Sequence, residues 1–256
     1  MPVTADIRTL YHLTFSPIRG ATHAARLESF YGGQATDYDA FRERLLPGRE
    51  ELIRLLDFPE GGMWVDLGCG TGANLLFARE RLEQLAHVYV VDLCPPLLEI
   101  ADRRIRENGW TNVATVFADA TTFAPPIAAD VVTFSYSLTM IPDWFTAVDQ
   151  AWRVLKPGGL IGVVDFHVSR KYADTGRARH GWMTRSLLPL WFGSDNVHLS
   201  SDHLPYLERR FRSMALVEKR ARLPWLPVVR VPYYVFIGCK EGQSSDEDRG
   251  GAETAT

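Results

Sequence analysis

Short apolar runs alternate with amphipathic stretches along most of the chain. The apolar runs predict strands near residues 63–67, 87–92, 112–117, 130–135 and 160–166. Two of the stretches between them have helical spacing: Pro95 begins one and Gly109 ends it, and residues 143–155 carry an apolar stripe. This alternation predicts an α/β fold with a doubly wound, mostly parallel sheet, whose ligands bind beyond the carboxyl ends of the strands.

Four segments lie outside the alternating pattern. Residues 1–60 have helical spacing and predict an N-terminal helical cap on a domain of residues 61–240. Residues 167–205 predict an insertion after the fifth strand, which caps the substrate. Residues 215–222 and 233–240 predict a C-terminal antiparallel hairpin that completes seven strands. Residues 241–256 hold five acids, one arginine and no large apolar side chain, which predicts a disordered tail.

Composition excludes several classes of protein. The 256 residues are 46% hydrophobic, enough for a normal core, and the net charge of −3 gives no general attraction for nucleic acid. No apolar run reaches the roughly 18–20 residues that span a bilayer, and the first residues lack the pattern of a secretory signal. Three cysteines without metal-ligand spacing predict no metal site and fit a reducing cytosol. We expect a cytoplasmic protein, soluble or peripheral on the membrane.

A glycine-rich turn follows the first predicted strand. Glycine is needed where the backbone takes positive φ or where a ligand approaches it closely. A helix begins near Ala73, and its free N–H groups suit an anionic group. The pattern predicts a polar, partly anionic cofactor against bare backbone, contacted by Asp66, Gly68, Cys69, Gly70 and Gly72.

The glycine spacing alone leaves two cofactors open. With Asp92 at the end of the next strand, it also fits a dinucleotide site for NAD. Three further features distinguish the two: Asp66 ahead of the glycine-rich turn, Ala118–Ala120 after the third strand, and Leu155–Leu160, which contains a Lys-Pro-Gly-Gly turn, before the fifth strand. Together they resemble the class I methyltransferases. That resemblance implies a Rossmann-like fold and S-adenosyl-L-methionine as the cofactor.

The resemblance also implies roles for single residues. Asp92, with Leu93 beside it, is expected to accept hydrogen bonds from both ribose hydroxyls, and Asp119 with Ala120 to contact the adenine edge. Ser135 and Tyr38 are further expected cofactor contacts. Tyr136, at the end of the fourth strand, and His167, just past the fifth, are candidate catalytic residues. The alternative is that these aromatic rings only pack in the core.

Longer blocks of sequence resemble one narrower family. They lie at residues 26–31, 38–42, 135–144, 164–170, 179–182 and 231–236. These blocks resemble the bacterial N-methyltransferases of betaine-lipid synthesis, which convert diacylglyceryl homoserine to its trimethylated form. The resemblance implies successive N-methylation of a lipid amine, with the aminocarboxypropyl-transferring enzyme that makes this lipid as a possible partner. A soluble amine acceptor and a non-catalytic cofactor-binding protein remain alternatives.

The insertion combines basic and apolar residues. Its cations can pair with a carboxylate of the acceptor, and its apolar run up to Trp191 can enter a bilayer interface. The alternative is an ordinary solvated basic face beside a core segment. The predicted substrate-binding residues are Tyr31, Arg170, Lys171, Arg179 and Trp182.

Overall fold

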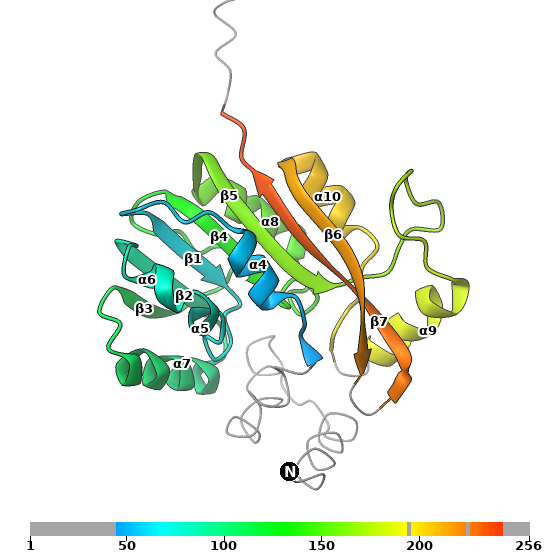
Figure 1. Ribbon diagram of the computed structural model, residues 1–256, viewed down its shortest axis with the longest axis horizontal. Helices are drawn as coiled ribbons and strands as arrows, with labels where there is room; N and C mark the ends of the chain where they lie inside the picture. The colour runs from blue at the N-terminus through cyan, green and yellow to red at the C-terminus, as the bar shows by residue number, and fades with distance from the viewer. Residues whose placement is uncertain (1–44, 194–195, 224–225, 243–256) are drawn as a thin grey trace, which may run out of the picture.

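A seven-stranded sheet forms the centre of the molecule in the computed structural model, which describes residues 45–193, 196–223 and 226–242 (Figure 1). The strand order is β3-β2-β1-β4-β5-β7-β6. The strands are β1 (Met63–Leu67), β2 (His87–Asp92), β3 (Val113–Phe117), β4 (Ala129–Ser135), β5 (Leu155–Phe166), β6 (Arg212–Leu223) and β7 (Leu226–Cys239).

The first five strands are parallel, and β7 runs antiparallel between β5 and β6. This arrangement confirms the predicted mostly parallel, seven-stranded sheet with a C-terminal antiparallel hairpin. The strand order reverses at β1, which pairs with β2 on one side and with β4 on the other. Ligands of such sheets bind at this reversal, beyond the carboxyl ends of the strands.

Helices cover both faces of the sheet (Figure 1). They are α4 (Arg49–Leu55), α5 (Asn74–Phe77), α6 (Arg79–Leu82), α7 (Pro95–Asn108), α8 (Trp144–Val154), α9 (Trp182–Gly193) and α10 (His203–Arg210). Leu52 of α4 and Leu98 of α7 belong to the core on one face, whereas Val148 of α8 and Leu207 of α10 belong to the core on the other.

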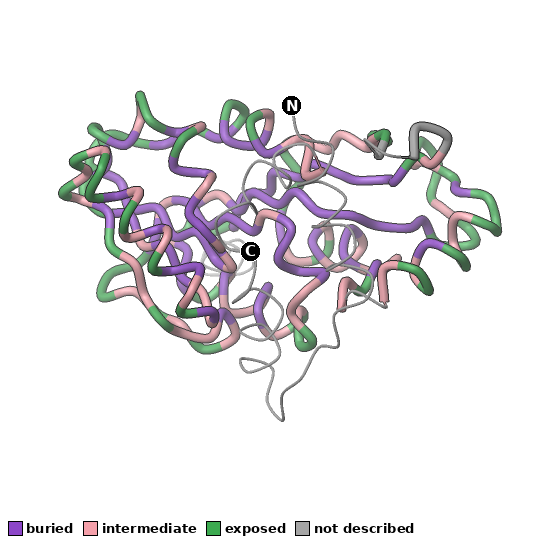
Figure 2. The backbone as a smooth tube through the Cα atoms, turned by 90° about the horizontal axis from the view of Figure 1, so that it is seen from below, coloured by how far each residue is buried: buried purple, intermediate pink, exposed green. Residues whose placement is uncertain are grey.

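Alternation along β1 explains why two cores form. Trp64 joins the core beneath α4, while Met63, Val65 and Leu67 join the core beneath α8. Successive strand side chains point to opposite faces, so an apolar strand buried on both sides supplies both cores. Buried backbone accordingly runs along the strands in Figure 2, with exposed backbone on the outer helices and loops.

Local signals set the ends of α7 and α8, the two longest helices between residues 45 and 160. Pro95 occupies the first turn of α7, and Gly109 ends it in the left-handed region with φ of 68°. Asp143 precedes α8 and accepts a hydrogen bond from Thr146 N at 3.2 Å. Proline in a first turn, glycine after a helix and an aspartate N-cap are standard end signals. Both predicted helices are confirmed.

The prediction that β5 begins at residue 160 is wrong. The strand begins at Leu155 and contains a bulge, because Lys156–Gly159 lie opposite a single residue of β4, Asp130. Gly158 there has φ of 81°, and Lys156 Nζ lies 2.8 Å from the carboxylate of Asp130. The Lys-Pro-Gly-Gly sequence therefore makes an irregularity inside a strand, not a turn before it.

The predicted N-terminal cap and acidic tail fall mostly outside the described residues, as do Tyr31 and Tyr38. The domain boundaries stay a prediction. The described part of the insertion contains α9 and the beginning of α10, which extends past residue 205 to Arg210.

Candidate active site

A cavity of about 310 Å³ opens at the carboxyl ends of β1, β2 and β4, where the strand order reverses. Its volume lies at the lower end of the roughly 300–1,000 Å³ of small-molecule sites. The glycine-rich turn forms one wall, and residues 135–143 form the opposite wall. Predicted cofactor residues that line it are Gly68, Cys69, Gly70, Asp92, Leu93, Asp119, Ala120 and Ser135.

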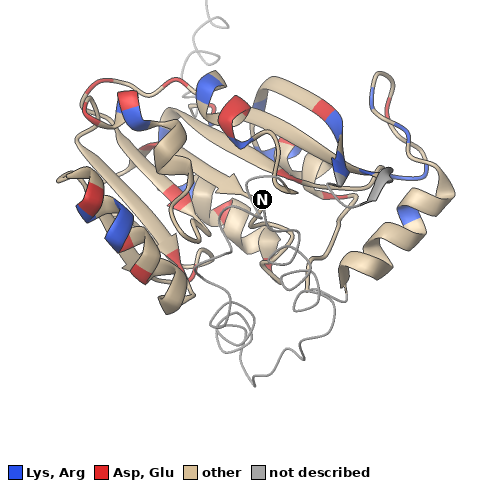
Figure 3. Cartoon of the chain, turned by 60° about the horizontal axis from the view of Figure 1, so that its bottom comes forward, with Lys and Arg blue, Asp and Glu red and all other residues tan. Residues whose placement is uncertain are grey.

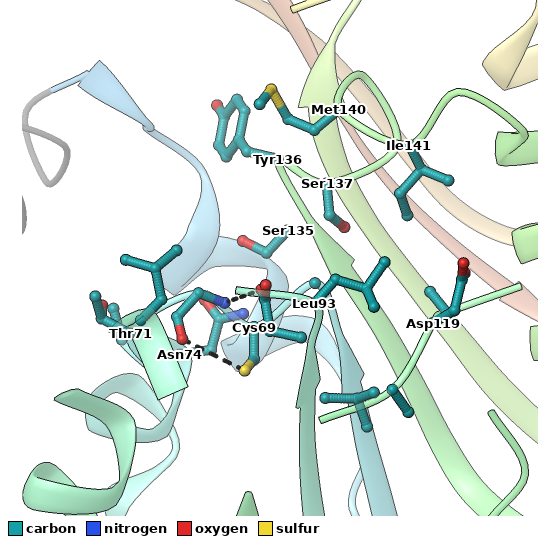
Figure 4. A pocket seen from close by; sticks show the side chains of 18 of the residues that line it. Cys69, Thr71, Asn74, Leu93, Asp119, Ser135, Tyr136, Ser137, Met140 and Ile141 are labelled. Carbon is teal, nitrogen blue, oxygen red and sulfur yellow. Dashed lines mark hydrogen bonds between the residues drawn. The ribbon is translucent and has the colours of Figure 1, made fainter. Parts of the chain in front are cut away.

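The glycine-rich turn is held by hydrogen bonds to β2 and its end. Gly68 N and Cys69 N both donate to Val91 O, at 2.8 and 3.1 Å, and Gly70 N donates to Asp92 Oδ2 at 2.8 Å. Figure 4 shows Cys69 and Leu93 together in this wall of the pocket. The turn is therefore a fixed surface beside Asp92.

Any side chain at position 68 would collide with neighbouring atoms. Its φ is +70°, and a Cβ added there would lie 2.4 Å from the Cβ of Ser137. Ser137 is itself held, since its Oγ donates to Leu67 O at 2.9 Å. The turn and the opposite wall of the cavity therefore touch directly at Gly68.

A buried chain of hydrogen bonds supports the turn from below. Trp64 Nε1 donates to Thr133 Oγ1 at 2.8 Å, and Thr133 Oγ1 donates to Asp66 Oδ1 at 2.6 Å. Asn74 Nδ2 donates to both oxygens of Asp66, at 3.2 and 3.0 Å. Burial raises the pKa of Asp66 to about 6. Asp66 does not line the cavity itself. Through its hydrogen bonds it orients Asn74, which does line the cavity.

The two acids expected to recognise the nucleoside both face the cavity. Asp92 accepts from Gly70 N with one oxygen and from Cys94 N, at 2.9 Å, with the other. Asp119 Oδ1 accepts from the backbone N and the hydroxyl of Thr121, at 2.8 and 2.7 Å. A carboxylate offers about four acceptor positions, so each acid retains capacity for a ligand.

Polar atoms in the cavity wall fit an amino- and hydroxyl-bearing ligand. In the described part of the chain, Asn74 Oδ1 and Ser135 Oγ are buried and make no hydrogen bond. A buried polar atom without a partner is unfavourable by about 1–3 kcal/mol, so both atoms favour a ligand that bonds to them. These atoms, the half-buried backbone of Gly68 and Gly70 in the cavity lining, and the Asp92 carboxylate fit S-adenosylmethionine.

Tyr136 combines backbone strain with a fixed side chain. It has φ of 56°, rare for a bulky residue, at the end of β4. Its hydroxyl donates to Pro47 O at 2.6 Å, and its ring packs on Phe166 with centroids 4.6 Å apart. Burial raises the pKa of its hydroxyl well above 10.0. Tyr136 therefore lines the cavity as a protonated ring, and its catalytic role stays a prediction.

Asp165 of β5 holds part of the wall formed by residues 135–143, on the side away from the cavity. Thr139 donates to this carboxylate through its backbone N at 3.1 Å and its hydroxyl at 2.7 Å. The insertion reaches the same wall, where His198 N donates to Thr139 O at 2.8 Å. The insertion therefore packs directly behind one side of the cavity.

Asp165→Asn should change how the stability of the protein depends on pH. Burial raises the pKa of Asp165 from 3.8 to about 7 in the folded protein. The stability it contributes is present below its unfolded pKa of 3.8 and is lost as pH rises through about 7. The wild type should therefore lose stability relative to the variant over this range, by up to about 1.4 kcal/mol per pH unit. Urea unfolding of both proteins near the two ends of this range measures it, and a constant difference would contradict the prediction.

His167 lies away from the cavity lining. It is 4% exposed, with its ring 5.3 Å from those of His180 and Tyr234. Burial lowers its pKa to about 3, so the ring is neutral at neutral pH. This candidate proton acceptor lies at the base of the insertion and does not line the cavity. Its catalytic role stays a prediction.

The predicted substrate cations are also absent from the lining. Arg170 pairs with Asp202 at 2.6 Å on the surface, Lys171 lies beside Tyr172, and Arg179 and Trp182 are exposed. Gly72, a predicted cofactor residue, likewise stays behind the lining, with Ala101 packed against it. Their assigned contacts remain predictions.

Sequence reasoning missed Arg49, which lines the cavity as the first residue of α4. It is buried, and its guanidinium lies 5.7 Å from the ring centre of Phe77. A cation in this wall suits the carboxylate of an amino-acid ligand. The only signal in the sequence was an arginine beginning an amphipathic helix.

Known proteins resemble the chain in sequence over this same region. Residues 65–159 match the family model described as a methyltransferase domain. A demethylmenaquinone methyltransferase of Geobacillus sp. is 27% identical over 149 residues, covering 58% of this chain and 63% of the relative. The enzyme of that name from Listeria innocua is 27% identical over 118 residues, 46% of this chain and 50% of the relative. The chain thus spans only about half to two thirds of these relatives.

Solved structures share the fold. The N-methyltransferase NodS from Bradyrhizobium japonicum, in complex with S-adenosyl-L-homocysteine, superposes with a TM-score of 0.62 at 15% identity, covering 84% of this chain and 99% of NodS. The [4+2]-cyclase SpnF superposes with a TM-score of 0.62 at 19% identity, covering 88% of this chain and 99% of SpnF. At these identities the likeness shows the fold alone, and one of the two neighbours is named for a cyclisation.

Proposed function

We propose that this chain is a class I S-adenosylmethionine-dependent methyltransferase, as its domain match and fold support, and that it methylates the amino group of diacylglyceryl homoserine. Three successive transfers would give the trimethylated betaine lipid. The observation that carries the proposal is the cavity between the glycine-rich turn and residues 135–143, with the basic and apolar insertion packed on the latter.

Residues of the cavity divide the work of holding the cofactor. The Asp92 carboxylate would bind the ribose hydroxyls, Asp119 and Ala120 the adenine, and Asn74 with Arg49 the amino-acid end. When bound, S-adenosylmethionine supplies a methyl group on a positively charged sulfur. The chain supplies position, and alignment of two reactants can contribute roughly 7–11 kcal/mol to lowering a barrier.

The acceptor side of the cavity is apolar with one acid at its edge. Met140, Ile141 and Pro142 line it, followed by Asp143, the N-cap of α8. An α-amine has a pKa of about 8, so freeing its lone pair at neutral pH requires only about 1.4 kcal/mol per unit. A strong base is unnecessary, and Asp143 suits the ammonium that each transfer forms. This combination favours an amine carried on an apolar anchor.

Purified protein, methyl-labelled cofactor and dispersed diacylglyceryl homoserine test the proposal directly. We expect label in the lipid phase, with mono-, di- and trimethylated species resolved by mass spectrometry. A dispersion of diacylglycerol, which lacks the homoserine group and its amine, is the control and should take up no label. Absence of label at saturating cofactor would exclude this acceptor.

A second candidate is methylation of a prenylated quinol, favoured by the names of the relatives. Its acceptor is a ring carbon, so the product carries no new charge, whereas the N-methylated lipid becomes a fixed cation. The same assay with demethylmenaquinol in place of the amine lipid separates the two. Cofactor binding without label in either acceptor, or in a panel of soluble amines, would favour the non-catalytic alternative.

A further inference from the structure

One face of α9 is apolar and open to solvent. Met183, Leu187, Leu190 and Trp191 are 56%, 49%, 76% and 38% exposed, and Trp182 at the start of the helix is 68% exposed. The first four follow the i, i+4, i+7, i+8 spacing of a single helix face. An apolar helix stripe normally faces a core, whereas the side chains of this stripe are partly exposed.

The opposite face of α9 is packed on the domain. Leu188 is buried, and the ring of Phe192 lies 5.3 Å from that of Phe166, which in turn packs on Tyr136. Tyr136 lines the cavity. The exposed stripe is therefore carried by a helix anchored, through two aromatic contacts, next to the reaction site.

Basic residues border the beginning of α9. Burial lowers the pKa of His180, just ahead of the helix, and the positive charges of Arg220 and Arg185 lower it further. Arg179 and Arg220 are exposed. The helix itself contains one arginine and no acid, and Figure 3 shows it at one end of the molecule with basic residues on the neighbouring loop and hairpin. An apolar stripe edged by cations complements an anionic, apolar surface.

We propose that the stripe of α9 (Met183, Leu187, Leu190 and Trp191), together with Trp182 at the start of the helix, docks on the surface of an anionic phospholipid bilayer. This inference rests on the proposed function, in which the acceptor is a lipid. A tryptophan within the stripe, a second tryptophan at the start of the helix and exposed arginines near that start are residues that interfacial helices use. In the described residues no helix has both the length and the apolar character needed to cross a bilayer.

A second copy of the chain fits the stripe less well than a bilayer. The stripe and Trp182 together make five side chains, against roughly 20–30 residues on each side of a standard protein interface. Two stripes meeting face to face would also bring the bordering arginines of both copies together. Docking on lipid would place the insertion at the membrane, and the insertion contacts the cavity wall at Thr139.

Sedimentation with vesicles of phosphatidylcholine and phosphatidylglycerol tests the docking without cofactor or turnover. We expect the full chain to pellet with these vesicles, and much less with phosphatidylcholine alone, because the arginines attract anionic lipid. Leu190→Glu should weaken binding roughly tenfold or more, since it removes apolar contact and adds a repelled charge. Ile127→Glu, at a residue 57% exposed outside α9 and the cavity lining, is the matched control and should bind as the wild type does.

Fluorescence locates the contact. Brominated lipid should quench the fluorescence of Trp182 and Trp191, and the quenching should drop in Trp182→Phe.

Three outcomes would each overturn the docking: equal losses of vesicle binding in Leu190→Glu and Ile127→Glu, no pelleting of the wild type, or dimerisation in solution that is lost in Leu190→Glu. Calorimetric binding of S-adenosylhomocysteine should be unchanged in Leu190→Glu. Vesicle binding is measured without the acceptor lipid. A failure to bind vesicles would therefore contradict the docking alone, and the methylation assay tests the proposed function separately.

Discussion

Gly68→Ala is expected to abolish methyl transfer by removing cofactor binding. The new Cβ would lie 2.4 Å from the Cβ of Ser137, so the turn must move away from the opposite wall. The left-handed backbone adds about 1–2 kcal/mol of strain for any residue with a Cβ. We expect the affinity for S-adenosylhomocysteine, measured by calorimetry, to fall at least about 100-fold, because the turn backbone that faces the ligand is displaced.

Two further variants separate strain from collision. Gly109 has φ of +68° and nothing within 4 Å of an added Cβ, so Gly109→Ala carries the strain alone and should lower stability while leaving affinity intact. Adding Ser137→Gly to Gly68→Ala removes the colliding atoms and should restore part of the affinity. If the double variant binds no better than Gly68→Ala, the contact with Ser137 is not the cause.

Asp92→Ala should have the second-largest effect. Its carboxylate would accept from two ribose hydroxyls, and hydrogen bonds to charged groups are worth about 1.5–3 kcal/mol each. Losing both predicts an affinity for S-adenosylhomocysteine at least about 100-fold weaker. The variant also frees the N–H groups of Gly70 and Cys94, so a lower melting temperature without ligand is expected as well.

Asp92→Asn distinguishes ligand contact from support of the turn. The amide retains one acceptor oxygen for the backbone but presents a donor in place of the second acceptor. Its affinity should lie between those of the wild type and Asp92→Ala, with a melting temperature closer to the wild type. Wild-type affinity in both variants would show that Asp92 does not contact the ribose and would reopen the assignment of the cofactor site.

Local chemistry explains what could be predicted from the sequence. Pro95, Gly109 and Asp143 act through the backbone of their own helix ends, so their signals are complete within a few residues. The glycine-rich turn is equally local. Because each parallel strand ends at the same edge of the sheet, finding the strand ends also predicted that Asp92, Asp119 and Ser135 would meet around one cavity.

Tertiary packing determined the rest. Arg49 reaches the cavity only because α4 packs across β5 and β7, which no short pattern in the sequence reports. His167 directly follows β5, yet its ring packs among His180 and Tyr234 at the base of the insertion, because strand position does not specify where the chain turns next. The bulge at Lys156–Gly159 was predicted as a turn because lysine, proline and glycine suit both structures.

Hydrogen bonds within the protein fix the glycine-rich turn: Gly68 N and Cys69 N donate to Val91 O, Gly70 N donates to Asp92, and Asn74, just after the turn, donates to Asp66, just before it. A surface that is already rigid loses little conformational entropy when it receives a small molecule. Most of the contact energy at this turn can then appear as affinity. Successive rounds of transfer, each of which exchanges a spent cofactor for a fresh one, would not require the turn to be rebuilt.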